Sequence, residues 1–290
     1  MPLMMPVGTV SVLDMHCHTK EGSMDGLASI FDIVRKMKNL GYTGLVVSDH
    51  NSYKGYETWV NGKDQYPDIA DFNVIKAIEY DSRDGGHVLI ILPDGVELKP
   101  LLVRGMKITR VLEEVHKAGG ICGMVHPFGP GAYAAMHTKK VMSHEDIQVQ
   151  YDFVETYNAH ITPMANDMAE ILNEKLNKPF TAGTDAHKLK YVATAATAFS
   201  CPITNTNELI DAILYRKMLY AGKVGSIEHP QLKGVVRFAT NTGYFVWNKS
   251  AALLYSKRRI RAWKKVKKQN QQDAVEENNA GYNQDQDTEE

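Results

Sequence analysis

The sequence predicts an α/β protein whose strands and helices alternate and come close to closing into a barrel. Short apolar runs typical of buried strands are separated by segments in which apolar residues recur at helical spacing. This alternation favours a mainly parallel sheet, and about seven strand–helix units follow one another along the chain. Histidines and carboxylates follow the apolar runs, which is where an α/β barrel gathers its active site. The sequence therefore predicts a barrel with polar residues collected at one end.

The first half of the chain contains five predicted strands. They are Thr9–Met15, Thr43–Ser48, Phe72–Ile78, His87–Leu92 and Ile121–Val125. The residues SRDGG between the third and fourth strands indicate a hairpin turn. Two helices are predicted in the same half. They are Leu27–Leu40, which ends at Gly41, and Met106–Lys117, which is followed by a pair of glycines.

The second half continues the alternation. The predicted strands are Tyr151–Tyr157, Pro179–Gly183 and Val192–Phe199. The predicted helices are Pro163–Leu176, which has a proline near its start, and Asn207–Lys217, which follows a capping region with the residues TNTNE.

The character of the sequence changes after about residue 222. We therefore predict a globular domain over residues 1–222, a helical extension over 223–268 and a disordered polar and acidic tail over 269–290. Val235–Lys268 is expected to form one or two helices. Its end, KRRIRAWKKVKK at residues 257–268, contains eight basic residues in twelve.

Composition sets limits on the class of protein. The chain has 290 residues, 43% of them hydrophobic and 23% charged, which is ordinary for a soluble globular protein. A formal net charge of −1 provides no global field that would attract a polyanionic partner. The three cysteines form no CxxC pair, which argues against a disulfide framework and a thiolate zinc site. With no signal-peptide pattern and no long apolar run, a cytoplasmic location is expected.

Two motifs place pairs of candidate metal ligands on one face of a strand. In DMHCH, side chains two residues apart point the same way, so Asp14, His16 and His18 can converge. The same spacing relates Asp185 and His187 in GTDAH. Imidazole suits zinc, iron and manganese, and carboxylate suits harder ions, so this set is compatible with several divalent metals.

A third motif, LVVSDHN, follows the second predicted strand directly. Because adjacent residues on a strand face opposite ways, only one of Asp49 and His50 is expected to reach a metal. His50 is the candidate ligand. Asp49 is then expected to orient a histidine or hold a water, with a helix cap or turn role as the alternative.

The remaining candidates lie on apolar strands or just beyond them. An ionised Glu79 in such a strand is costly unless it is paired or coordinated, and its carboxylate can bridge two ions. His87 and His126 follow as further ligands. Arg83, in the intervening turn, is either a bidentate partner for a phosphate oxygen or a solvated turn residue.

Polar residues near the ligand candidates have supporting roles in this interpretation. Glu155 lies inside an apolar strand, and with Asn158 it is a candidate for a position around the ligands. His160, beyond this strand, is expected at the surface. A structural zinc site needs only four ligands, so a larger set predicts two or three divalent ions, with Zn, Mn and Fe as the candidates. The candidate ligands are His16, His18, Asp25, His50, Glu79, His87, His126, Asp185 and His187.

The motifs DMHCHT, SDHN, E…GH, HP and GTDAH, in this order, resemble those of the PHP family, named for polymerase and histidinol phosphatase domains. The resemblance runs from Asp14 to about Lys217. It implies a distorted, TIM-like (βα)7 barrel with a di- or trinuclear site at the carboxyl ends of its strands. It also implies phosphoesterase activity, commonly on small phosphomonoesters.

The resemblance assigns roles to individual residues. His16, His18, Glu79 and Asp185 match one metal site; Glu79, His87 and His126 match a second that shares Glu79; and His50 and His187 match a third. Several relatives have a further histidine ligand at the third site. Here the segment EGSMDG offers Asp25, with Glu21 and Ser23 as lesser candidates.

The expected function is hydrolysis of a small phosphomonoester, such as a nucleotide or a sugar or amino-alcohol phosphate, by metal-activated hydroxide. Arg83 is expected to stabilise charge on phosphate, and His187 or Asp25 to protonate the leaving group. The alternatives are histidinol phosphatase, phosphodiesterase or exonuclease activity, or a metal-binding module without catalysis. Long nucleic acid is a less favoured partner, because no basic stripe lies near the expected site. Residues 257–268 suggest weak contact with an anionic surface, or a packed helix with a solvated basic edge.

Overall fold

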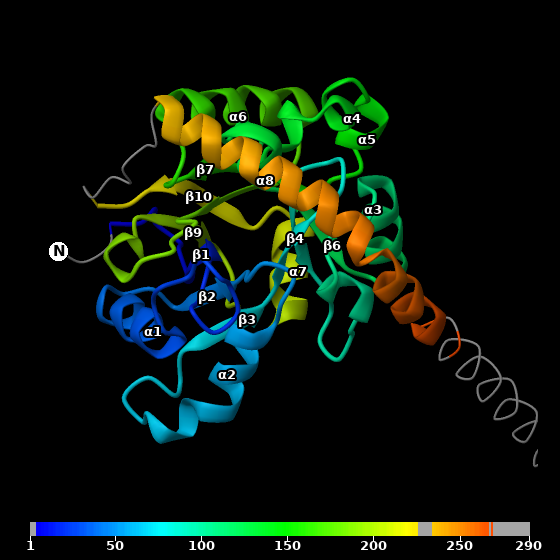
Figure 1. The fold of residues 1–290 in the computed structure, drawn as a ribbon. Helices are drawn as coiled ribbons and strands as arrows, with labels where there is room; N and C mark the ends of the chain where they lie inside the picture. The colour runs from blue at the N-terminus through cyan, green and yellow to red at the C-terminus, as the bar shows by residue number, and fades with distance from the viewer. Residues whose placement is uncertain (1–3, 226–233, 267, 269–290) are drawn as a thin grey trace, which may run out of the picture.

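The computed structural model describes residues 4–225, 234–266 and 268, and its strands form two five-stranded sheets (Figure 1). The first sheet has the order β10-β9-β1-β2-β3. Its strands are β1 (Ser11–Cys17), β2 (Gly44–Val47), β3 (Asn73–Lys76), β9 (Ala195–Phe199) and β10 (Met218–Lys223). β1, β2 and β3 are parallel, whereas β9 is antiparallel to both of its neighbours.

The second sheet has the order β4-β5-β6-β7-β8. Its strands are β4 (Ile78–Asp81), β5 (His87–Ile91), β6 (Ile121–Met124), β7 (Phe153–Asn158) and β8 (Phe180–Gly183). β4, β5 and β6 pair antiparallel, and β6, β7 and β8 pair parallel. The predicted hairpin is confirmed, with Asp81 opposite His87 across the turn.

The mixed α/β class is confirmed, but the predicted (βα)7 barrel is not, and the described strands form two sheets that do not close into a barrel. On one side the sheets separate at Ala77, where β3 ends and the chain turns into β4 to pair with the antiparallel β5. On the other side, β1 pairs with the antiparallel β9, and it is joined to the loop after β8 by an isolated bridge between Cys17 and Ala186 and by a few hydrogen bonds, without a strand ladder in the described residues. A closed barrel needs a continuous ladder around its circumference, and these two breaks interrupt it.

Helices cover the sheets on the outside (Figure 1). They are α1 (Ile30–Asn39), α2 (Lys54–Gly62), α3 (Ile108–Lys117), α4 (Lys139–Met142), α5 (Glu145–Gln148), α6 (Pro163–Leu176), α7 (Thr206–Leu214) and α8 (Gly234–Leu254). Short 3-10 turns lie at Lys63–Gln65, Lys99–Leu102, Gly131–Tyr133, Ala135–His137 and Leu189–Tyr191.

Capping residues explain where the predicted helices begin. α1 starts three residues later than expected, because the Ser29 hydroxyl accepts a hydrogen bond from the backbone of Asp32. Asn205 caps α7 in the same way, by accepting from the backbone of Glu208. α7 ends at Leu214, before the predicted end, and the chain then forms the unpredicted edge strand β10. The predicted domain boundary at residue 222 falls inside this strand.

The two sheets share a hydrophobic interior. Leu13 of β1, Val46 of β2, Leu89 of β5 and Phe153 of β7 are all fully buried in one cluster. Burial of these side chains holds β1 close to the strands of the second sheet. The ends of β1, β4, β5 and β8 therefore lie near one another, where the ligand candidates are found.

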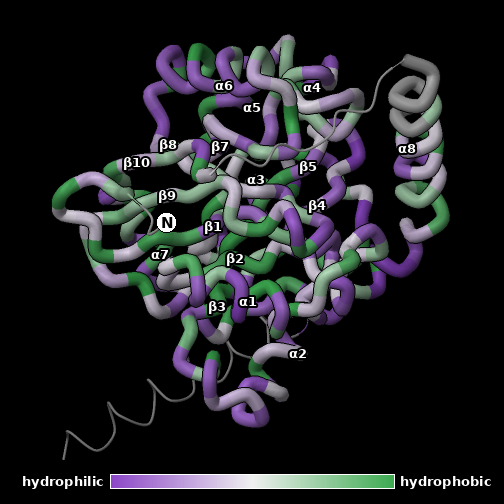
Figure 2. The backbone as a smooth tube through the Cα atoms, turned by 90° about the vertical axis from the view of Figure 1, so that its left-hand side faces the viewer, coloured by the Kyte–Doolittle hydropathy of each residue, from purple (hydrophilic) through white to green (hydrophobic). Residues whose placement is uncertain are grey.

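The C-terminal part of the described chain is helical, with α8 followed by helical residues 256–266. α8 crosses the outer side of the second sheet and lies along one edge of the molecule (Figures 1 and 2). Asn248 donates to the carbonyl of Ser82 at 2.8 Å, and Trp263 is buried in the core beside α3. The predicted tail over 269–290 lies outside the described residues.

Packing of Trp263 supports the interpretation of residues 257–268 as a packed helix with a basic edge. The side chains of Lys257, Arg258, Arg261, Lys264 and Lys265 are exposed. Within the described ranges, none of the helices combines the length and apolar character needed to cross a bilayer.

Candidate metal centre

Glu79 of β4 lies at the centre of the histidine cluster and is 1% exposed. One carboxylate oxygen lies 2.8 Å from His87 Nδ1 and 2.9 Å from His126 Nε2. The other lies 3.3 Å from His18 Nε2 and 3.2 Å from His50 Nδ1. His16 Nε2 lies 3.5 Å from the first oxygen. The two oxygens thus face separate groups of imidazoles, which is the arrangement expected of a carboxylate shared between two metal ions.

Asp185 completes the inner part of the cluster. One of its oxygens lies 3.1 Å from His18 Nε2 and 3.8 Å from His16 Nε2. Asp185 and His126 both have positive φ, at 50° and 30°. Non-glycine residues rarely adopt this region, and such strain is concentrated at functional sites.

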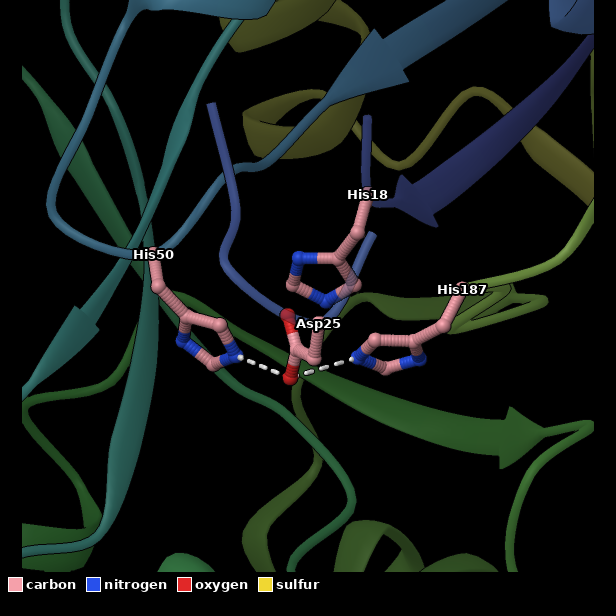
Figure 3. A group of neighbouring side chains, drawn as sticks. All are labelled: His18, Asp25, His50 and His187. Atoms are coloured by element: carbon pink, nitrogen blue, oxygen red, sulfur yellow. Dashed lines mark ion pairs between the residues drawn. The ribbon is translucent and has the colours of Figure 1, made fainter. Parts of the chain in front are cut away.

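Asp25 forms the outer part of the cluster, at the rim. Its carboxylate lies between His187 Nε2, at 3.1 Å, and His50 Nε2, at 3.7 Å, with His18 nearby (Figure 3). Of the other two candidates, Glu21 accepts from the backbone of Ile30 at the start of α1. Ser23 contacts His18 Nδ1 at 3.1 Å. The geometry therefore favours Asp25 as the carboxylate of the third site.

The donor set fits divalent metal ions. Within the described residues, four groups of side chains in this cluster place one ligand atom each within 4.8 Å of one another, and neighbouring groups share His16, His18 or His50. His16 Nε2 and His50 Nδ1 are buried and make no hydrogen bond in the described part of the chain. Buried polar atoms are normally satisfied, so these nitrogens are suited to metal coordination. Imidazole and carboxylate together suit Zn, Mn and Fe.

The electrostatics of the cluster keep its carboxylates ionised. Burial alone would raise the pKa of Glu79, but His87, His50 and His16 hold it well below its usual value. Burial likewise opposes ionisation of Asp185, and His16 and His18 lower its pKa. Burial and the neighbouring His187 lower the pKa of His18 to about 4, so its imidazole is neutral at neutral pH, which is the form that binds a metal ion.

Two of the predicted supporting residues hold ligand side chains directly. One oxygen of Glu155 lies 3.1 Å from His16 Nδ1, and the other accepts from the backbone of His126 at 2.7 Å. Asn158 donates to Glu155 at 2.9 Å and to Asp185 at 3.3 Å. These contacts fix the orientation of groups that belong to different strands.

The other two predicted supporting residues hold backbone rather than imidazole rings. Asp14 accepts from the backbone of His16 and Thr184, which ties β1 to the loop after β8, and burial raises its pKa to about 7. Asp49 accepts from the backbone and hydroxyl of Thr19 and from the hydroxyl of Ser23. It thereby shapes the loop that carries Asp25.

Asp81, which sequence reasoning missed, also belongs to the cluster. One oxygen lies 3.2 Å from His50 Nδ1 and 3.1 Å from His87 Nε2. The other forms an ion pair with Arg104. The sequence does contain a pattern that predicts this position, because Asp81 follows Glu79 at the same two-residue spacing that relates His16 to His18.

Arg104 has a place that the sequence did not predict, whereas the exposure of Arg83 agrees with the solvated-turn alternative. Arg104, which carried no motif, lies beside the cluster, whereas the Arg83 side chain is exposed and lines a neighbouring cavity. The hydroxyl of Tyr244, from the distant α8, lies 2.7 Å from His87 Nε2. His160 is half-buried rather than at the surface, with its ring centroid 5.5 Å from that of His187.

Comparison with known proteins agrees with this architecture. A family model described as PHP-associated matches residues 163–218. PsfC from Pseudomonas syringae has 17% sequence identity and a TM-score of 0.56, with 81% of this chain and 97% of that protein covered. The search of curated protein sequences found no match.

Two further solved structures share the fold. One is a two-domain protein from Bacteroides vulgatus containing a predicted PHP-like metal-dependent phosphoesterase, with 15% identity, a TM-score of 0.58 and coverage of 75% of this chain and 67% of that one. The other is the lesion-specific endonuclease PfuEndoQ from Pyrococcus furiosus, with 16% identity, a TM-score of 0.55 and coverage of 73% and 58%. The chain has the fold of metal-dependent phosphoesterases of this kind. The matched segment and the shared fold make the chain similar to PHP-domain proteins.

Proposed function

We propose that this protein hydrolyses a small phosphomonoester, such as a nucleotide or a sugar or amino-alcohol phosphate, with two or three divalent ions held by the cluster. The observation that carries the proposal is the placement of Glu79, whose two oxygens face separate groups of imidazoles. A single structural ion would need neither this sharing nor so many donors.

Divalent ions bound at such a site lower the pKa of a water molecule and offset the charge of the phosphoryl oxygens. The buried carboxylates of the cluster would bind these ions, and the contacts of Glu155 and Asn158 fix the orientation of the ligand side chains. His187 and Asp25 lie at the more open side of the cluster, with side chains 20% and 53% exposed. A leaving group can reach them there, so we assign the leaving-group proton to this pair.

The His187–Asp25 contact also fits that assignment electrostatically. Burial would lower the pKa of His187, but Asp25 and Asp185 raise it to about 9. When only two ions are bound and the third site holds none, the imidazole is therefore protonated around neutral pH and can donate a proton toward the rim.

The proposal is tested by phosphate release from a panel of phosphomonoesters, including p-nitrophenyl phosphate, with Mn²⁺ or Zn²⁺ present. We expect turnover by the wild-type protein and a loss of more than about 100-fold in the variant Glu79→Gln. The matched control is Glu170→Gln on the exposed side of α6, which should keep full activity. Absence of turnover on the whole panel would contradict the proposal and favour a metal-binding module without catalysis.

A second candidate is phosphodiester cleavage, because PfuEndoQ has a similar fold. Comparison of bis-p-nitrophenyl phosphate with p-nitrophenyl phosphate separates the two. We expect faster hydrolysis of the monoester, and the reverse order would favour the diesterase.

We also propose a cytoplasmic location, which the buried, unpaired Cys17 and Cys122 support.

A further inference from the structure

A cavity of about 460 Å³ lies beside the metal centre. Its walls come from the turn between β4 and β5, the segment from Ala132 to His144, and α8. Its basic lining residues are Arg83, Lys139, Lys140 and Lys249. The cavity was not visible in the sequence, because these four residues come from three separate segments.

The cavity has a strong excess of positive charge. Asp84 is its acidic lining residue, and the Asp84 carboxylate already accepts from the backbone of Ile108. Within the described ranges, none of the four cations forms an ion pair with a carboxylate. Lys249 donates to the carbonyl of Arg83 at 2.8 Å, which holds α8 against the turn. Cations left without counter-charges around one cavity favour an anionic ligand.

The cavity and the metal centre share a wall. Tyr244 lines the cavity, and its hydroxyl lies 2.7 Å from His87 Nε2. Ser82 and Gly86, also in the lining, are the immediate neighbours of Asp81 and His87. One substrate molecule can therefore place one end at the metals and the other among the lysines.

We propose that this cavity binds a second phosphate group of the substrate, so that the enzyme prefers bisphosphates over monophosphates. The inference rests on the proposed function, because it assigns the first phosphate to the metal centre. A phosphate monoester carries a charge of about −1.5 to −2 at neutral pH, which the facing lysines can balance. Arg83 then acts on this distal phosphate through its position in the cavity wall, not on the phosphate that is cleaved.

The test uses straight-chain alkane diols carrying a phosphate at one end or at both ends, over a series of chain lengths. With the full chain and Mn²⁺, we expect kcat/KM for the best bisphosphate to exceed that of its matched monophosphate by about tenfold or more. The variant Lys139→Gln/Lys140→Gln should lose this preference through a higher KM for the bisphosphate. The control Lys99→Gln/Lys217→Gln removes the same charge from exposed positions outside the cavity and should retain the preference.

Equal kcat/KM values for both series in the wild-type protein, or an unchanged preference in Lys139→Gln/Lys140→Gln, would overturn the inference. Titration calorimetry measures binding of the bisphosphate without turnover, so it distinguishes failure of the cavity proposal from failure of the proposed phosphatase activity. If phosphate is never released, binding by the wild type that the lysine variant loses still supports the cavity. Absence of both release and binding would overturn both proposals.

Discussion

Glu79 carries a charge in a place where a lone charge would be strongly destabilising. Within the described residues, five imidazoles lie around its two oxygens, and they keep its pKa well below the ordinary value. The same residues that offset the cost of burial are also the candidate ligands. At the residue scale, the ionised state of the cluster and its ability to hold cations therefore have a single cause.

Asp81 provides a residue-scale test of the cluster, because it contacts both His50 and His87. We expect Asp81→Asn to weaken metal affinity by about 10- to 100-fold, because the contacts that orient these imidazoles become weaker. Titration of the metal-free protein with Mn²⁺ measures the change. Asp64→Asn, at an exposed position, is the control. Equal metal affinities for the two variants would show that Asp81 does not contribute to the site.

A second residue-scale prediction concerns His116, whose Nε2 lies 2.9 Å from the carboxylate of Asp152. This contact raises the pKa of His116, although burial opposes the shift. The stabilising contribution is therefore fully present below the unfolded-state pKa of about 6.5 and is lost as pH rises through the folded-state pKa. We expect His116→Gln to lower the free energy of unfolding by about 0.5 kcal/mol at pH 5.5 and by less at pH 9. Urea denaturation at both pH values checks this, and a larger loss at pH 9 would contradict it.

At the scale of elements, the approach of β8 to β1 sets the geometry of the centre. Gly183 ends β8 against His16, and a Cβ at this position would lie 2.2 Å from the His16 Cβ and 2.8 Å from a Glu155 oxygen. β1 and β8 share no ladder, so packing at such points determines how the two sheets meet.

Gly183→Ala is expected to force β8 away from β1. We predict a loss of about 1–3 kcal/mol in the free energy of unfolding and a drop in metal affinity, because His16 and Asp185 separate. Gly243→Ala, in α8, should be neutral or slightly stabilising, because the new Cβ would lie within 4 Å of no described residue beyond its own turn of helix. Thermal denaturation and Mn²⁺ titration of both variants test this, and similar behaviour of the two would contradict it.

At the scale of the whole molecule, the sequence predicted the features that depend on local pattern, which are the strands, the helices and the ligand residues near them. His16, Glu79 and Asp185 were found because they lie in or just after short apolar runs, and the structure brings these side chains together. The predicted strand Phe72–Ile78 is divided into β3 and β4, so Glu79 lies near the start of β4 and not after a strand. The closed barrel could not be tested from pattern alone, because strand order depends on pairing between distant segments. Likewise, nothing in the local sequence indicates that Tyr244 reaches His87 from α8.

The central claim is that one chain holds at least two divalent ions around Glu79. The most direct measurement is the metal content of the protein after equilibration with Mn²⁺ and removal of unbound ions. We predict two or three ions per wild-type chain and at least one fewer in Glu79→Gln, with Glu170→Gln unchanged. A wild-type chain that retains one ion or none, or a Glu79→Gln variant that retains the full number, would contradict the account.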